Sequence, residues 1–265
     1  MDQNENLKIL DNFTYPPAGR CIYCGNTNEL SKEHILPWGL SGSAGLPKAS
    51  CPKCRKITGQ FEQKLLRGPM WAVRVYRGMK SRTKHEQAPK SYPLKLIKNG
   101  TEEKIQVPIE EYPILLPFLI FEPPAYLNPE GHEKGISLVG IATVRFGPEP
   151  ETVAKRLGAE RLIIDRSQEP VAFARMIAKI AYAYAWAEKK IDLIQGEPFV
   201  LPAILGEADD IGRWVGTLTD PIKKYDNLLH RILIYEDYEK HLLFGEVHLF
   251  SDSEAPRYGV ILGEI

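Results

Sequence analysis

Apolar residues recur with helical spacing in two parts of the chain. Downstream of Lys56, apolar residues that include Phe61 and Leu65 share one side of a helix, which Gly68 is expected to end. Residues 170–190 are alanine-rich and carry few charges. This pattern predicts a long helix that is packed on most sides.

Strand patterns dominate the later part of the chain. Apolar segments on both sides of Asn99-Gly100 predict a hairpin with a tight turn. The pattern therefore predicts an α+β fold, with a mixed α+β domain of unknown role over residues 91–265 and a boundary near residue 90. Further strands are expected at 136–146, 232–235, 242–250 and 258–263, apolar runs lie at 114–121 and 162–164, and short helices are expected at 71–79 and 151–158.

Composition adds little at the level of the whole chain. Of the 265 residues, 43% are hydrophobic and 26% are charged, as in ordinary globular proteins, and the formal net charge is zero. No apolar run approaches the roughly 18 residues that span a membrane. The first ten residues are polar and lack the features of a signal peptide. We therefore expect a cytoplasmic protein without a membrane partner.

Charge is concentrated in one segment. Between Lys48 and Lys90 there are 12 Lys or Arg residues and two acids, Glu62 and Glu86, so this segment carries +10 and the rest of the chain −10. Such a segment is typical of surfaces that bind phosphates. The alternative is a solvated helix face.

The four cysteines form two CxxC pairs: Cys21 with Cys24, and Cys51 with Cys54. Two such pairs can present four thiolates to one zinc ion in a tetrahedron. Unmetallated buried thiols or a redox pair are the alternative, which the closeness of the two pairs argues against. We predict a structural Zn²⁺ site.

The stretch between the pairs contains Glu33-His34-Ile35-Leu36-Pro37, and a predicted helix follows the second pair. This arrangement resembles the zinc-bound HNH family, in which an Asp/Glu-His-Ile-x-Pro strand lies between two CxxC knuckles. The resemblance covers residues 21–68 and, more loosely, the helix around Phe173–Ala181. It implies an N-terminal zinc-bound ββα-metal module, taken here as residues 1–90 with the basic helical extension.

The resemblance also implies roles for individual residues. His34 would be the general base, and Glu33 would help to hold a catalytic Mg²⁺ or Mn²⁺ ion. A neutral imidazole suits proton abstraction near pH 7. The alternative for His34 is a core histidine that orders the zinc loop.

Two positions depart from the family pattern. Arg55 stands where the family usually has an Asn ligand, and Gly59 stands at another frequent ligand position. Neither side chain can bind a divalent cation. Either Glu62 on the same helix supplies the missing carboxylate, or the site no longer cuts. The alternative for Glu62 is an exposed helix acid with no part in metal binding.

Two functions follow from these observations. The first is a metal-dependent HNH-type endonuclease that hydrolyses phosphodiester bonds of DNA. The second is a non-cutting nucleic-acid-binding zinc module, which Arg55 and Gly59 favour. A zinc-stabilised adaptor for proteins would leave the basic segment unexplained. The expected nucleic-acid contacts are Arg55, which could hold a phosphate through its planar guanidinium, together with Lys56, Arg67, Arg74 and Arg77.

Overall fold

A computed structural model describes residues 13–79, 91–128, 131, 134–164, 168–222 and 224–265. The fold is mixed α+β, as the sequence predicts, and it begins with a ββα segment. Strand β1 (Ser31–His34) pairs antiparallel with β2 (Gly45–Ser50), and helix α1 (Pro52–Arg67) follows. The predicted short helix near residue 71 is α2 (Trp71–Tyr76).

Helix α1 ends where the sequence pattern places it, but it begins at Pro52, four residues before the start expected near Lys56. Pro52 occupies the first turn, where its missing N–H costs nothing, and the helix ends at Gly68. Its buried residues are Cys54, Thr58, Phe61 and Leu65, which recur every three or four positions.

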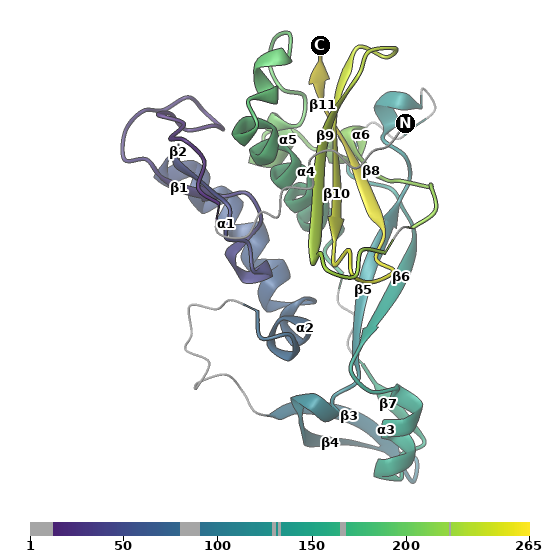
Figure 1. The fold of residues 1–265 in the computed structure, drawn as a ribbon. Helices are drawn as coiled ribbons and strands as arrows, with labels where there is room; N and C mark the ends of the chain where they lie inside the picture. Colours follow the sequence, from purple (N-terminus) through teal and green to yellow (C-terminus); the bar gives the residue numbers. More distant parts are fainter. Residues whose placement is uncertain (1–12, 80–90, 129–130, 132–133, 165–167, 223) are drawn as a thin grey trace.

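Helix α4 (Pro170–Ala187) lies at the centre of the molecule (Figure 1). It packs against α1 and against a four-stranded sheet of order β8-β11-β10-β9. The sheet can approach α4 closely because Gly245 has no side chain at this contact. A Cβ at Gly245 would lie only 2.6 Å from the Cβ of Ala181. The sheet consists of β8 (Val215–Thr217), β9 (His230–Asp237), β10 (Leu242–Leu249) and β11 (Arg257–Glu264).

The remaining strands form two smaller sheets (Figure 1). The hairpin around Asn99-Gly100 is confirmed, and both turn residues have positive φ, at 50° and 71°. A small second core lies between this hairpin and α3 (Pro150–Leu157). The strands are β3 (Ser91–Lys98), β4 (Thr101–Pro108) and β7 (Arg161–Ile163) in one sheet, and β5 (Ile114–Phe121) and β6 (Leu138–Phe146) in the other. The other helices are α3 (Pro150–Leu157), α5 (Leu201–Leu205) and α6 (Ile211–Trp214), with short 3₁₀ turns η1 (Trp38–Leu40), η3 (Ile109–Glu111), η4 (Ala125–Leu127) and η5 (Lys190–Leu193).

The main hydrophobic core runs from Tyr15 to Leu262 and includes both the ββα segment and the C-terminal sheet. The domain boundary expected near residue 90 falls at 80–90, outside the described residues, as does the end of the basic segment. In the part of the chain that the structure describes, no helix combines the length and apolarity needed to cross a membrane.

Candidate functional site

The four cysteines converge on one point. Cys21 and Cys24 lie in the loop before β1, and Cys51 and Cys54 lie at the start of α1. Their four sulfur atoms lie within 4.8 Å of one another, and the Sγ atoms of Cys24 and Cys51 are 3.6 Å apart. Tetrahedral zinc with Zn–S bonds of about 2.3 Å requires sulfur separations of about 3.8 Å. The cluster is therefore consistent with a zinc site.

The protonation of the cluster depends on its surroundings. Burial raises the pKa of the Cys54 thiol, and the neighbouring thiols raise it further. For Cys51, burial opposes ionisation, but hydrogen bonds from the Cys54 backbone and from neighbouring thiols lower its pKa to about 7. A bound Zn²⁺ ion would stabilise the thiolate forms, so binding would release protons.

A second cluster lies on the inner side of the ββα segment. Glu33 on β1 and Glu62 on α1 both face Lys179 of α4, whose ammonium nitrogen lies 2.7 Å from Glu33 Oε1 and 3.0 Å from Glu62 Oε1. The exposed fractions of the side chains are 1% for Lys179, 8% for Glu33 and 19% for Glu62. Lys179 also donates to the backbone carbonyl of His34. Glu62 is therefore a largely buried ion-pair partner and not an exposed helix acid.

The surroundings of this cluster shift the pKa values of Lys179 and Glu62. Burial acts to lower the pKa of Lys179, but the two carboxylates outweigh it and raise the pKa above its usual range. Burial raises the pKa of Glu62, the nearby Glu33 carboxylate adds to this, and Lys179 opposes it. Lys179 is therefore held as a cation against two carboxyl groups.

His34 is half-buried at the end of β1. Its ring centroid lies 5.5 Å from that of Trp38, which begins the 3₁₀ turn after Pro37. Neighbouring side chains on a strand point to opposite faces. The imidazole therefore packs near Trp38, whereas the Glu33 carboxylate is directed toward Lys179. The role of His34 as a base stays a prediction.

The predicted nucleic-acid residues fall into two groups. Arg55, Lys56 and Arg67 are exposed on α1. Arg74, in contrast, donates from Nε to the Gly39 carbonyl at 2.5 Å and from Nη1 to the Leu66 carbonyl at 2.7 Å.

The Arg77 side chain also makes contacts within the molecule. Its Nη1 atom lies 2.6 Å from Asp252 Oδ2, and its guanidinium lies over the ring of Phe146. The α1 residues are therefore the more accessible part of the predicted contact set.

The sequence prediction missed Lys179. The available signal was a single lysine inside an alanine- and isoleucine-rich helix, at a position where a lysine is rarely buried unless it is paired.

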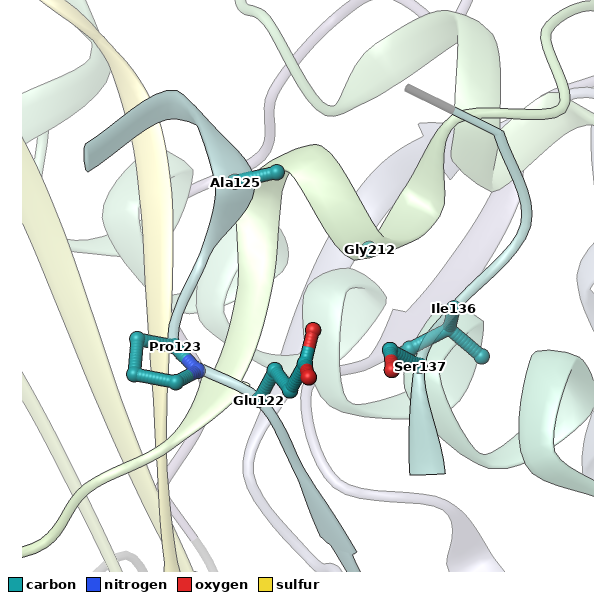
Figure 2. A pocket seen from close by; sticks show the side chains of 6 residues that line it. All are labelled: Glu122, Pro123, Ala125, Ile136, Ser137 and Gly212. Atoms are coloured by element: carbon teal, nitrogen blue, oxygen red, sulfur yellow. The ribbon is translucent and has the colours of Figure 1, made fainter. Parts of the chain in front are cut away.

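Two hollows lie among the described residues, and the larger one borders the cysteine cluster. Figure 2 shows the smaller one, near the end of β5, whose volume of about 10 Å³ has room for about one water molecule. The larger one, of about 420 Å³, lies between the first CxxC loop, the end of α4 and the segment 191–201. Cys24 lines it and is exposed, so the cysteine cluster can be reached from this side. The small hollow is lined by Glu122, Pro123, Ala125, Ile136, Ser137 and Gly212.

The fold and the site define a mixed α+β protein whose N-terminal ββα segment bears a four-cysteine cluster consistent with zinc. Comparison with known proteins gives no match to a family model, to a curated protein or to a solved structure.

Proposed function

We propose that the protein binds nucleic acid, with DNA as the expected form, through the exposed side of a zinc-stabilised α1. One observation carries the proposal: all exposed charged residues of α1 are basic, and its single acid, Glu62, is turned inward to Lys179. A helix face of one sign attracts phosphates and does not repel them locally. The exposed basic residues are Lys53, Arg55, Lys56 and Arg67, together with Lys64, which pairs with Glu169 at 2.6 Å.

The length of this face suits a nucleic-acid backbone. Lys53, Lys56 and Arg67 lie along one row with Gln60 and Gln63, and the row covers about 21 Å at about 1.5 Å per residue. Duplex DNA advances about 3.4 Å per base pair, so the row matches roughly six base pairs. Amide side chains between the cations add neutral hydrogen-bond donors for phosphate or base edges.

Contacts at two places hold the basic face of α1 in a fixed position in the fold. The cysteine cluster holds the start of α1, and the ion pair of Glu62 with Lys179 holds its inner side against α4. Side chains on a fixed helix lose less conformational freedom on binding than side chains on a loop. This supports contact with phosphates without a large rearrangement of the protein.

Hydrolysis of DNA, which the HNH resemblance implies, is the second candidate. The convergence of Glu33 and Glu62 beside the backbone carbonyl of His34 favours it. The residues do not fit the divalent ion that such a reaction would need, because the ammonium of Lys179 lies against both carboxylates. The non-cutting binder is therefore the function that the geometry supports best.

The proposal is tested by comparing two triple variants for binding of a fluorescent 20-base-pair DNA duplex. The first carries Lys53→Glu, Lys56→Glu and Arg67→Glu on α1. The matched control carries the same change of charge on exposed residues of the small β3–β4–β7–α3 unit: Lys104→Glu, Lys155→Glu and Arg161→Glu. We expect the first to lose binding and the control to keep it. Equal loss in both would mean that only net charge matters and would contradict a role for α1.

A further inference from the structure

The oxygen atoms around the Lys179 ammonium form a cation site. Glu33 Oε1 lies at 2.7 Å, Glu62 Oε1 at 3.0 Å and the Ile35 carbonyl oxygen at 3.5 Å, and the His34 carbonyl accepts a hydrogen bond. Two carboxylates with two backbone carbonyls are a donor set of the kind that binds hard divalent cations such as Mn²⁺ or Mg²⁺.

The ammonium belongs to the core and does not reach in from the surface. Lys179 lies in the middle of α4, and the residues on either side of it, Ala178 and Ile180, are fully buried. Burying an unpaired ammonium group costs several kcal/mol, so its position depends on the two carboxylates. The carboxylates depend on Lys179 in turn, because Glu33 and Glu62 are held close together and would otherwise repel each other.

We propose that Lys179 is the resident cation of this site and excludes a divalent ion from it. An ion coordinated by both carboxylates would have to lie within about 3 Å of the same oxygen atoms, where the ammonium already lies. Two cations at that separation in a partly dry site repel strongly. The positive charge that a divalent ion would bring to Glu33 and Glu62 is instead supplied by the chain itself.

The use of Lys179 in place of a divalent ion also joins two parts of the fold. The carboxylates come from β1 and α1 of the ββα segment, whereas the cation comes from α4, which packs on the C-terminal sheet. A bound divalent ion would bridge β1 and α1 alone. Lys179 bridges both to the central helix. This inference does not rest on nucleic-acid binding, and it can fail while that proposal stands.

The test is a titration of zinc-loaded protein with Mn²⁺. The electron paramagnetic resonance signal of free Mn²⁺ measures how much of the ion is bound. Wild type and Glu33→Gln should show the same Mn²⁺ binding, because no ion uses Glu33 while Lys179 is present. Lys179→Ala should gain one Mn²⁺ per chain, and its melting temperature should rise when Mn²⁺ is added. Adding Glu33→Gln to Lys179→Ala should weaken that binding by at least about ten-fold.

Two results would overturn the inference. One is a Mn²⁺ ion in the wild type that is lost in Glu33→Gln. The other is a folded Lys179→Ala protein that binds no additional Mn²⁺. If Lys179→Ala does not fold, Lys179→Met, which keeps most of the side-chain volume without the charge, replaces it in the same comparison, and a folded Lys179→Met protein that binds no additional Mn²⁺ overturns the inference.

Discussion

The imidazole Nε2 of His230 lies 2.9 Å from the backbone carbonyl oxygen of Leu40, a residue 190 positions earlier in the chain. His230 Nδ1 accepts a hydrogen bond from the Phe250 N–H at 3.1 Å, so Nε2 carries the proton and donates to Leu40. One neutral histidine therefore ties the turn after β1 to the C-terminal sheet.

This histidine should make stability depend on pH. Burial, against the opposing hydrogen bond to the Leu40 carbonyl and together with the nearby Arg77 and His248, lowers the pKa of His230 to about 4. An unfolded histidine titrates near pH 6.5, so the unfolded state binds more protons between pH 6.5 and 4. The stabilisation is therefore fully present above pH 6.5 and is lost as the pH falls toward 4.

We expect the free energy of unfolding to fall by an amount on the order of 3 kcal/mol from His230 over that range. His248 adds to the same trend, because burial also lowers its pKa to about 4. Urea unfolding between pH 4 and 7 measures the effect. His230→Gln, whose amide can accept and donate, should flatten the pH dependence. An unchanged slope in that variant would show that His230 does not cause it.

Zinc should be required for the fold of the ββα segment. Cys51 precedes the first turn of α1, and Ser is a good residue at that position, so Cys51→Ser removes a thiolate without harming the helix start. We expect about one zinc per chain in the wild type by mass spectrometry, and loss of zinc with a lower melting temperature in the variant.

A chelator provides the control for this prediction. EDTA should lower the melting temperature of the wild type and leave Cys51→Ser unchanged, since Cys24 exposes the cluster to solvent. Protein purified without chelators that contains no zinc would refute the metal assignment.

Two glycines of the ββα segment should respond to alanine in opposite directions. A Cβ at Gly42 would lie 2.2 Å from the Leu36 carbonyl oxygen, so Gly42→Ala forces the backbone apart and should cost roughly 1–3 kcal/mol. At Gly59, inside α1, the nearest side-chain atom to an added Cβ is Gln63 Nε2 at 3.9 Å, and Gly59→Ala should stabilise by roughly 0.5–1 kcal/mol. Thermal unfolding of both variants measures this, and destabilisation by Gly59→Ala would be the contrary result.

Cleavage can be tested separately from binding. Incubation of supercoiled plasmid with Mg²⁺, Mn²⁺ or EDTA should give the same slow background for wild type and His34→Ala, because Lys179 pairs with both candidate carboxylates. Metal-dependent nicking that is lost in His34→Ala would instead establish the nuclease. Arg55→Asn, which places at this position the residue usual in the HNH family that the sequence resembles, tests whether the missing ligand limits activity.

Local features of the fold could be predicted because they depend on neighbouring residues. The end of α1 follows from Gly68, and the hairpin turn follows from Asn99-Gly100. The start of α1 at Pro52 lies four residues before the start that the sequence predicts near Lys56, because the apolar pattern begins only after the second CxxC pair. The cysteine cluster could also be predicted, since two CxxC turns restrict four thiols to one ion. By contrast, α5, α6 and β8 have five residues or fewer, too few to show a period.

Long-range pairing could not be predicted in the same way. The sequence places Glu33 and Glu62 in one module, and both do face the same point. It gives no sign that the partner at that point comes from position 179, because a helical period shows which side of α4 is apolar but not what it meets. The internal contacts of Arg74 and Arg77 are missed for the same reason.

The most direct test of nucleic-acid binding by α1 is the salt dependence of duplex binding, measured by fluorescence anisotropy. For three or four phosphate contacts, the logarithm of the binding constant should fall with the logarithm of salt concentration with a slope of about −3. The triple variant Lys53→Glu, Lys56→Glu and Arg67→Glu should have a slope close to zero, because each lost phosphate contact reduces the magnitude of the slope by about one. A wild-type affinity that is independent of salt, or an unchanged slope in the triple variant, would contradict the account.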